Sequence, residues 1–378
     1  MFEARPSVLI VDLSACYGGA DVRVIELCQS IRERVDLTVA VLKGSGVEAR
    51  LRQAGVALWP IARRKGDPRI ILDLFQCLRA RRPQSIDAHN PQSILWGLVA
   101  AWLARVPNRI VTIHSVYEES EKLRAGKLLF GALYGLVQLL ATRVVVVSEY
   151  VRAHLLGTAI EPSKIIVIEN GVVIPERIAW RREKDRCRIA IVGRLVPVKG
   201  HSVLFRALER LSRRGHIIDC IVIGDGPARG KLEAEAKARG LSSQVSFLGF
   251  RADVQALLVT CDALIMPSLT EALPFAALEA AALGLLIVAS SVGGLKLCFR
   301  DADTAKLVNP GSIDDLANAI VWCITCKEEA VAMGTRARKM VSERFSLSRM
   351  IDQTLLLYAR GEPIVGSRQQ EFEQNAAG

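Results

Sequence analysis

Short apolar runs alternate with longer amphipathic segments along almost the whole chain, and this alternation limits the possible folds more than any other feature. The first run, at residues 8–11, precedes a segment at 21–33 that has one apolar face. The pattern continues to a run at 143–147 and restarts at 188–192. Such alternation is typical of parallel strands covered by helices on both faces. We therefore expect an α/β protein built from doubly wound, Rossmann-like units.

A break in the alternation indicates where one domain ends. The pattern stops near Asn170-Gly171, and the charged stretch at 181–186 follows, so we expect the linker there. A chain of 378 residues is also long enough for two domains. The predicted organisation is an N-terminal domain at 1–178, a C-terminal domain at 186–345, closing helices at 346–362 and a disordered polar tail at 363–378.

Composition excludes several classes of protein. With 51% hydrophobic and 24% charged residues, the chain is globular rather than disordered, collagen-like or coiled-coil. Its nine cysteines are scattered, which favours buried thiols in a reducing compartment, and we assign the close pair Cys323 and Cys326 to core packing. The run at 8–11 is too short for a signal peptide, and Thr142-Arg143 interrupts the apolar stretch at 128–147. We therefore expect a cytoplasmic protein without a membrane-spanning helix.

Two loops that follow strand-like runs carry residues suited to bind an anion, and ligands of doubly wound sheets bind beyond the carboxyl ends of strands. Tyr17-Gly18-Gly19-Ala20 precedes a helix, and its glycines would let backbone N–H groups approach an anion, although glycines in such loops are often only structural. Arg194 and Lys199 follow the run at 188–192. Elsewhere they would be ordinary surface cations, but at the carboxyl end of a strand they favour a diphosphate clamp.

A third loop carries two carboxylates in different surroundings. Pro274 suits the first turn of a helix and Gly284 its end, so Glu271 lies in the entry loop and Glu279 about two turns along the helix. Carboxylates can accept hydrogen bonds from paired sugar hydroxyls. Capping or surface exposure would explain Glu271, but Glu279 has apolar neighbours and would be costly to bury unpaired. We therefore expect both carboxylates to face one cleft.

These loops belong to a longer series of motifs in a characteristic order. In this respect the sequence resembles the retaining glycosyltransferases of family 4, which have the two-domain GT-B architecture, over nearly the whole chain. Each motif is weak alone, and the resemblance rests on their joint order. The motifs are Gly18-Gly19-Ala20 with Arg23, Thr112-Ile113-His114-Ser115, Val147-Ser148-Glu149, Glu169-Asn170-Gly171-Val172, Gly193-Arg194-Leu195 with Lys199-Gly200, Ile223-Gly224-Asp225-Gly226-Pro227, Phe247-Leu248-Gly249, Glu271 with Glu279, and Gly293-Gly294.

The resemblance implies two Rossmann-like domains that face each other across a cleft holding a nucleotide-diphospho-sugar. Arg194 and Lys199 would hold the diphosphate and stabilise its charge as it leaves, with help from the backbone of Gly19. Glu279 would accept hydrogen bonds from the ribose hydroxyls. Transfer would retain the anomeric configuration and need no metal or other cofactor, because the cations and helix ends supply the electrostatic stabilisation.

The resemblance also assigns the remaining contacts of the donor. Glu271 would contact the donor sugar, in a segment whose next residues are Ala272 and Leu273. The base would rest against the backbone around Phe250 and Arg251.

Histidines at strand ends supply the candidates on the acceptor side. A lone histidine such as His114 at a strand end is often structural, but its match to the strand-end histidine of the family favours a place near the sugar and the acceptor. His89 and Asn90 end another run on the same side and are further acceptor-side candidates. With the cations and Glu271, His114 completes the predicted catalytic set.

The chain departs from the family pattern at three positions: Ala272, Leu297 and Ala305 replace a common glycine, acid and glycine. The main expectation is a transferase that adds a sugar to a glycan or lipid-linked acceptor in cell-envelope polysaccharide or glycolipid synthesis. Two alternatives stay open. A sugar-nucleotide epimerase with the GT-B fold would need no acceptor, and a non-catalytic nucleotide-sugar-binding subunit would fit the departures at Ala272 and Leu297.

The net charge of +11 admits several kinds of partner. Basic groups of the N-terminal domain could contact an anionic membrane or an acceptor phosphate, which would place the protein on the inner face of the plasma membrane, or could form a solvated surface. Nucleic acid is not expected, since no basic stripe has interleaved aromatics. Asp301-Ala302-Asp303 looks like a metal motif but lies in a late loop, and we expect no metal there. The basic groups are Arg63-Arg64-Lys65, Arg81-Arg82, and Lys122 with Arg124 and Lys127.

Overall fold

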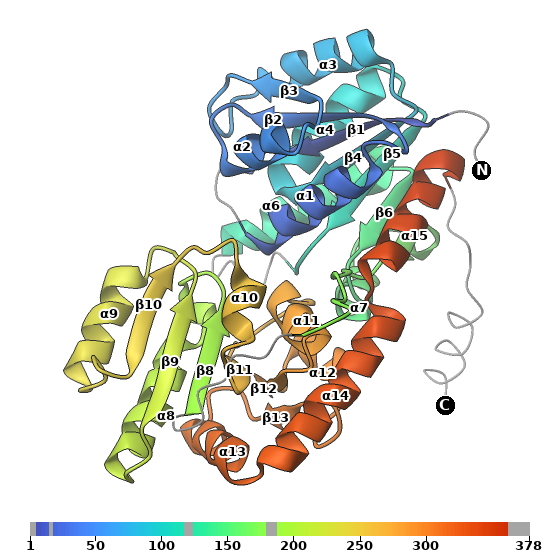
Figure 1. Ribbon diagram of the computed structural model, residues 1–378. Helices are drawn as coiled ribbons and strands as arrows, with labels where there is room; N and C mark the ends of the chain where they lie inside the picture. Colours follow the sequence, from blue (N-terminus) through green and yellow to red (C-terminus); the bar gives the residue numbers. More distant parts are fainter. Residues whose placement is uncertain (1–4, 15–17, 117–123, 179–186, 362–378) are drawn as a thin grey trace.

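The computed structural model describes residues 5–14, 18–116, 124–178 and 187–361. Four regions discussed above lie outside these residues: Tyr17, Lys122, the stretch at 181–186 and the tail at 363–378. The side chains of Arg124 and Lys127 are likewise not described. The described chain forms two α/β lobes, with the N-terminal strands in the upper lobe of Figure 1 and the C-terminal strands in the lower lobe.

The N-terminal lobe contains seven parallel strands among the described residues, in the order β3-β2-β1-β4-β5-β6-β7. The continuous apolar runs are buried on both faces, which is why they lack polar alternation. The order reverses between β1 and β4, so the carboxyl ends of these strands form a topological switch point. The strands are β1 (Ser7–Asp12), β2 (Asp36–Leu42), β3 (Leu58–Ile61), β4 (Ser85–His89), β5 (Asn108–Ile113), β6 (Arg143–Val146) and β7 (Ile165–Val167).

Helices cover both faces of this sheet. One face packs against α1 (Gly19–Ile31), α2 (Gly46–Gln53) and a helix from the far end of the chain, α15 (Leu347–Arg360). The other face packs against the remaining helices of the lobe, which are α3 (Ile70–Arg81), α4 (Asn90–Leu103), α6 (Arg124–Leu140) and α7 (Glu149–Leu155).

The C-terminal lobe repeats the same design with six parallel strands among its described residues, in the order β10-β9-β8-β11-β12-β13. Its switch point lies between β8 and β11. The strands are β8 (Cys187–Val192), β9 (Ile218–Ile223), β10 (Val245–Gly249), β11 (Ala263–Met266), β12 (Leu286–Ser290) and β13 (Lys306–Val308), and the helices are α8 (His201–Arg213), α9 (Arg229–Ala238), α10 (Val254–Leu258), α11 (Phe275–Ala282), α12 (Gly293–Cys298), α13 (Ile313–Thr325) and α14 (Lys327–Arg344).

The chain crosses between the lobes twice, and the two crossings pair with each other. Backbone hydrogen bonds join Val172 to Phe345 and Leu347, and the guanidinium of Arg344 donates two hydrogen bonds to Glu169 at 2.6 and 2.9 Å. The long helix α14 ends in the lower lobe, and α15 continues upward to the N-terminal lobe (Figure 1). The last described helix therefore completes the first domain.

The structure contains short or polar elements that the sequence pattern did not predict: α7, β7, α10, α12, β13 and α14. All of them except α14 have seven residues or fewer, and α12 begins with two glycines, which are poor helix formers. Helix α14 is long but rich in charged residues, and it packs against α11 along a narrow face of small residues. Such segments lack a periodic run of apolar residues long enough to predict them from the sequence.

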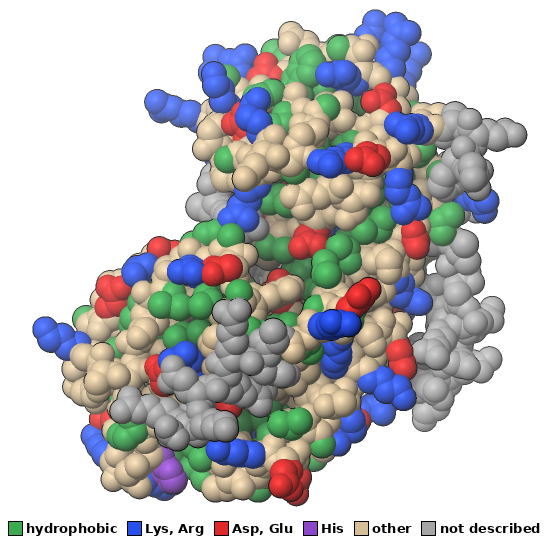
Figure 2. Space-filling model, in the orientation of Figure 1, with side chains coloured by type: hydrophobic (Ala, Val, Ile, Leu, Met, Phe, Trp, Pro, Cys, Tyr) green, Lys and Arg blue, Asp and Glu red, His purple; other side chains and the backbone are tan. Residues whose placement is uncertain are grey.

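The surface has a mixed charge pattern on the face shown in Figure 2, where Lys and Arg side chains are spread over both lobes among Asp and Glu. Within the described residues, no helix is both long enough and apolar enough to cross a bilayer. The predicted core cysteine Cys323 is buried in the C-terminal lobe.

Candidate active site

The loops at the carboxyl ends of the two sheets meet between the lobes. A Cβ placed on Gly19, the first residue of α1, would lie 4.0 Å from the ring of Phe275, the first residue of α11. Ala272 packs against the core of the N-terminal lobe, and Val22 of α1 packs against the core of the C-terminal lobe. Two helix N-termini, whose free N–H groups suit an anion, therefore share one interdomain boundary.

The two predicted cations of the loop after β8 have different surroundings. Arg194 is exposed, and its side chain makes no hydrogen bond or ion pair with any described residue. Lys199 ends a short 3-10 turn and points inward. Gly200 follows with a φ of +72°, and a Cβ there would collide with the carbonyl of Pro267 after β11. Only glycine lets these two loops approach so closely.

Lys199 and Glu271 form an ion pair that unites the β8 and β11 loops. The Lys199 Nζ lies 2.6 Å from Glu271 Oε1, and the Ser268 hydroxyl donates to the same oxygen at 2.7 Å. Glu271 is 8% exposed, so its carboxylate needs these partners. From sequence we predicted separate contacts for the two side chains, to phosphate and to sugar. Their mutual contact was missed because 72 residues separate them.

The glycine pair at the start of α12 packs against the backbone of residues 271–273. The N–H of Gly294 donates to the Glu271 carbonyl at 2.8 Å. A Cβ on Gly294 would overlap the carbonyl of Ala272. The backbone of α12 therefore contacts the predicted sugar-binding segment directly, and a larger residue at Gly294 would displace it.

Glu279 lies on α11 and is half-buried. Its burial, together with the charge of Glu26 on α1, raises the pKa of Glu279 from 4.5 to about 7. Burial also raises the pKa of Glu26. Two carboxyl groups from different lobes thus interact across the boundary, and neither forms an ion pair with a described basic residue. The effect of Glu26 on the pKa of Glu279 was not predicted from the sequence.

Replacing Glu279 with glutamine is expected to raise the melting temperature mainly above neutral pH. Because folding raises the pKa of Glu279, the folded protein binds this proton more tightly than the unfolded chain, so stability falls as the pH rises from 4.5 to about 7. Calorimetric Tm values should agree for the wild type and Glu279→Gln near pH 4.5 and differ at about pH 8. Glu26→Gln should also raise Tm at this pH, because it removes both the repulsion on Glu279 and the buried charge of Glu26 itself. An equal Tm difference at both pH values would contradict the assignment.

A buried hydrogen-bond chain joins α1 to the β11–α11 segment. Arg23 is 1% exposed, and its Nη1 donates to Asn170 Oδ1 at 2.9 Å. The Asn170 amide donates in turn to the Leu273 carbonyl at 2.8 Å. Asn170 belongs to the crossing segment, so this chain sets the position of Leu273 relative to the N-terminal lobe. Arg23 and Asn170 were present in the motif series, but sequence reasoning gave them no role.

The strand-end histidines of the N-terminal lobe are in direct contact. His89 Nδ1 lies 2.9 Å from His114 Nε2. His89 is 1% exposed, whereas His114 is half-buried. Asn90 is already engaged, because its amide donates to Asp12 Oδ1 at 2.8 Å and accepts from the backbone and hydroxyl of Ser93. The structure thus brings His114 and His89 together, while the Asn90 side chain serves the start of α4.

Comparison with known proteins identifies the family. A model described as Glycosyltransferase Family 4 matches residues 17–174, and one described as Glycosyl transferases group 1 matches residues 175–340. The Bacillus subtilis (strain 168) protein EpsF, named as a glycosyltransferase, is 30% identical over 277 residues, 68% of this chain and 69% of EpsF. The chain belongs to glycosyltransferase family 4.

Other similar proteins support this glycosyltransferase assignment. An Escherichia coli protein named UDP-Gal:alpha-D-GlcNAc-diphosphoundecaprenol alpha-1,3-galactosyltransferase is 26% identical over 308 residues, 77% of this chain and 79% of that protein. The crystal structure of Anabaena HepE with UDP and glucose superposes with a TM-score of 0.82 at 21% identity, covering 94% of this chain and all of HepE, and confirms the GT-B fold. Neither the epimerase nor the scaffold alternative gains support from these proteins.

The predicted base-binding residues of this family 4 member lie at the end of β10. Phe250 is 49% exposed, and the guanidinium of Arg50, on α2 of the other lobe, lies 4.8 Å from the centre of its ring. Arg251 forms an ion pair with Asp253 at 2.6 Å. Arg50 was not predicted, because its contact with Phe250 depends on how the two lobes meet.

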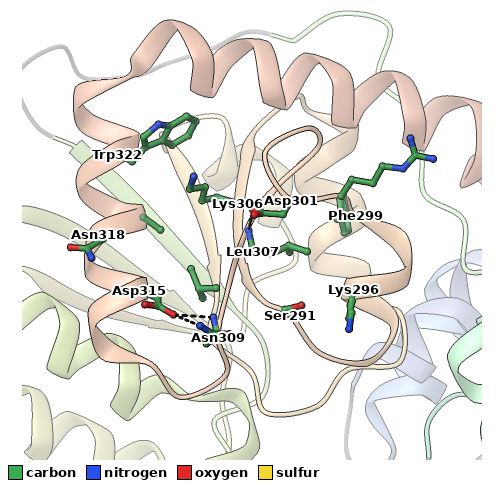
Figure 3. A pocket seen from close by; sticks show the side chains of 13 residues that line it. Ser291, Lys296, Phe299, Asp301, Lys306, Leu307, Asn309, Asp315, Asn318 and Trp322 are labelled. Atoms are coloured by element: carbon green, nitrogen blue, oxygen red, sulfur yellow. Dashed lines mark hydrogen bonds between the residues drawn. The ribbon is translucent and has the colours of Figure 1, made fainter.

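A hollow of about 830 Å³, whose lining is drawn in Figure 3, includes none of the predicted site residues of the transferase. It follows the outer strand β13, where Lys306 lies 5.0 Å from the Trp322 ring and the Asn309 amide donates to Asp315. In the metal-like motif, Asp301 accepts from the Leu307 backbone and Asp303 pairs with Arg336. No cluster of possible metal ligands was found among the described residues.

Proposed function

We propose that this family 4 glycosyltransferase moves a hexose from a UDP-sugar to a sugar-diphosphate carried on a polyprenyl lipid, with retention of the anomeric configuration and without a metal ion. The observation that carries the proposal is the pair of cations in the β8 loop beside Glu271. The E. coli relative, named as a galactosyltransferase acting on GlcNAc-diphosphoundecaprenol, supports the acceptor class, and the complex of HepE with UDP and glucose supports the donor class.

The electrostatics of the cleft suit departure of a diphosphate. Arg194 is unpaired among the described residues, so its planar fork is available for two phosphate oxygens. Lys199 adds a compact charge, which it must share between the diphosphate and Glu271. Together with the N–H groups at the start of α11, these cations would stabilise the negative charge that develops on the leaving UDP. A divalent ion would serve the same purpose.

Three further side chains would contact the ribose, the donor sugar and the acceptor. Glu279 would accept hydrogen bonds from the ribose hydroxyls, for which its carboxyl must be ionised. Glu271 would face the donor sugar beside Lys199. His114 lies in the opposite lobe at the end of β5, on the side where an acceptor would enter.

Binding and transfer assays test the donor and acceptor separately. Titration calorimetry with UDP, GDP and ADP in the presence of EDTA should give saturable binding for UDP. Incubation with UDP-hexoses and a synthetic GlcNAc-diphosphate lipid should then give an α-linked product, which NMR of the anomeric proton would identify. Binding of another nucleotide would overturn the donor class. A β-linked product would overturn retention, and activity lost in EDTA and restored by Mg²⁺ would overturn metal independence.

A lipid-linked acceptor also calls for contact with a membrane surface, and we place it on α4 and α6. These helices follow neighbouring strands and pack side by side on one face of the sheet. Near their C-terminal ends, Trp102 and Leu139 are 55% and 79% exposed. Arg105 is exposed beside Trp102 and suits an anionic headgroup.

Replacing Leu139 with glutamate is expected to weaken binding to vesicles containing phosphatidylglycerol by about tenfold, because an exposed leucine loses its burial in the lipid interface. Cosedimentation with vesicles of stated composition measures this. Val331→Glu is the matched control, since Val331 is also exposed but lies on α14 of the other lobe. Equal binding of all three proteins, or no binding by the wild type, would contradict the proposed surface.

A further inference from the structure

The segment that begins at Glu271, residues 271–273, is held at both ends by hydrogen-bond donors from other parts of the chain. The N–H of Gly294, on α12, donates to the Glu271 carbonyl at 2.8 Å. The side-chain amide of Asn170 donates to the Leu273 carbonyl at 2.8 Å, although 103 residues separate the two. Gly294 belongs to the same lobe as the segment, whereas Asn170 belongs to the crossing between the lobes. The segment therefore has one anchor in its own lobe and one in the connection to the other lobe.

Arg23 fixes which way the Asn170 amide points. The Arg23 Nη1 lies 2.9 Å from Asn170 Oδ1, and an arginine side chain can only donate hydrogen bonds. The Leu273 carbonyl can only accept them. One orientation of the amide satisfies both neighbours, with its oxygen toward Arg23 and its nitrogen toward Leu273. Arg23 and Asn170 are 1% and 4% exposed, so both bonds are shielded from water.

The backbone beside Asn170 is fixed by the second crossing. The N–H of Val172 donates to the Phe345 carbonyl, and the N–H of Leu347 donates to the Val172 carbonyl, both at 2.9 Å. A Cβ on Gly171 would lie only 2.6 Å from a carbonyl oxygen of the second crossing, so the two crossings are in close backbone contact. The Asn170 amide is therefore attached to the junction of the two lobes.

The N–H groups of Ala272 and Leu273 are free of partners among the described residues. The carbonyls of Glu271 and Leu273 are engaged, but no hydrogen bond joins the N–H of Ala272 or Leu273 to a described residue. Leu273 is 4% exposed, and a buried N–H that stays unpaired is costly. These two donors therefore suit oxygen atoms of a bound ligand, and the anchors at the two ends of the segment set their position.

We infer that Asn170 is a positioning residue of the transferase: through its bond to the Leu273 carbonyl, the crossing between the lobes sets where residues 272 and 273 hold the donor sugar, and Arg23 keeps the amide in the required orientation. The donor sugar rests on the proposed function, whereas the coupling of the segment to the crossing does not. The sugar is thereby placed relative to the N-terminal lobe, where the acceptor would enter, as well as relative to the lobe that would bind UDP.

Asn170→Asp removes one of the two bonds and keeps the other. Burial lowers the pKa of Arg23 only to about 10, so Arg23 remains a cation that favours an ionised carboxylate beside it. The carboxylate still accepts from Arg23, but its second oxygen opposes the Leu273 carbonyl. We expect kcat for transfer to fall by roughly 10- to 100-fold through displacement of the sugar, while UDP affinity changes by less than about threefold. Steady-state kinetics and titration calorimetry measure the two quantities.

Gln244→Glu is the matched control. Gln244 is also 4% exposed and uses both ends of its amide, since its Oε1 accepts from the Ile218 N–H and its Nε2 donates to the Ser212 hydroxyl, both at 3.2 Å. It precedes β10 and so lies at the opposite end of the C-terminal sheet from the donor loops. The same exchange of a buried amide for an acid should therefore lower Tm and leave kcat unchanged.

Hydrogen exchange in the ligand-free chain tests the coupling without any substrate. Mass spectrometry of a peptide spanning residues 269–280 should show faster exchange in Asn170→Asp than in the wild type, and Gln244→Glu should match the wild type there. Equal exchange of this peptide in all three proteins would overturn the coupling. Unchanged kcat in folded Asn170→Asp would overturn the positioning role, as would parallel losses of kcat and UDP affinity, which a general structural defect produces.

The two readouts separate a failed inference from a failed function. If the exchange results are as expected but no UDP-sugar is bound, the proposed donor fails and the coupling stands. If Asn170→Asp does not fold, Asn170→Ala decides the question with the same readouts, because it also removes the bond to Leu273 and buries no new charge.

Discussion

Lys199→Ala is expected to lower kcat/KM for sugar transfer by about 10²- to 10³-fold, the effect of removing one preorganised group from a developing charge. The Lys199 ammonium lies in the β8 loop, where it contacts Glu271 and would face the leaving diphosphate. Because the lost contact is charge-assisted, UDP affinity measured by calorimetry should also fall by roughly 10- to 100-fold. Steady-state kinetics measure the fall in kcat/KM, with the UDP-hexose that the transfer assay selects as donor.

Two further variants separate this loss from a loss of folding. Among the described residues, removing Lys199 leaves the buried Glu271 carboxylate with only the Ser268 hydroxyl as a side-chain partner, which will lower Tm. The double variant Lys199→Ala/Glu271→Gln should recover stability without recovering UDP affinity. Arg194→Ala removes an exposed side chain and should weaken UDP binding at unchanged Tm. Unchanged UDP affinity in both Lys199→Ala and Arg194→Ala would refute the diphosphate clamp.

Gly294→Ala is expected to disable the enzyme although it adds a single methyl group. The new Cβ would overlap the carbonyl of Ala272, a backbone atom that cannot rotate away. The Glu271–Leu273 segment must therefore move, which breaks the 2.8 Å hydrogen bond from Gly294 to Glu271. Overpacking of this kind costs about 1–3 kcal/mol or more, and a displacement of about 1 Å at a reacting centre can cost about 100-fold in rate. Chemical denaturation and steady-state kinetics measure the two effects.

Gly230→Ala is the matched control for this substitution. Gly230 lies in α9, and a Cβ there would meet no atom within 4 Å. The change should leave activity unaltered and raise stability by up to about 1 kcal/mol, because alanine is the better helix former. Full activity in Gly294→Ala would show that the segment after Glu271 tolerates displacement and would remove it from the sugar site.

Much of the site could be predicted because its parts are local. Arg194, Lys199 and Glu271 follow apolar runs, and the carboxyl ends of parallel strands on either side of a switch point must lie together. Glu279 stood out as an acid among apolar neighbours. These inferences need only the alternation of strands and helices along the chain and the helix period, both of which are short-range properties. The boundaries of short elements were less well predicted, because α12 and β13 have three to six residues and no clear period.

The sequence by itself therefore determined the fold class and the two-lobe division, since the apolar period is a property of neighbouring residues, and the chemistry of its loops predicted the candidate donor-site residues. Only the tertiary structure decided which of those side chains touch. The pairing of Lys199 with Glu271, the interaction of Glu26 with Glu279, and the bond from Asn170 to Leu273 across 103 residues depend on how the two lobes and the crossings between them pack. Long-range contacts of this kind leave no local pattern, because they are fixed by the burial of whole faces rather than by spacing along the chain.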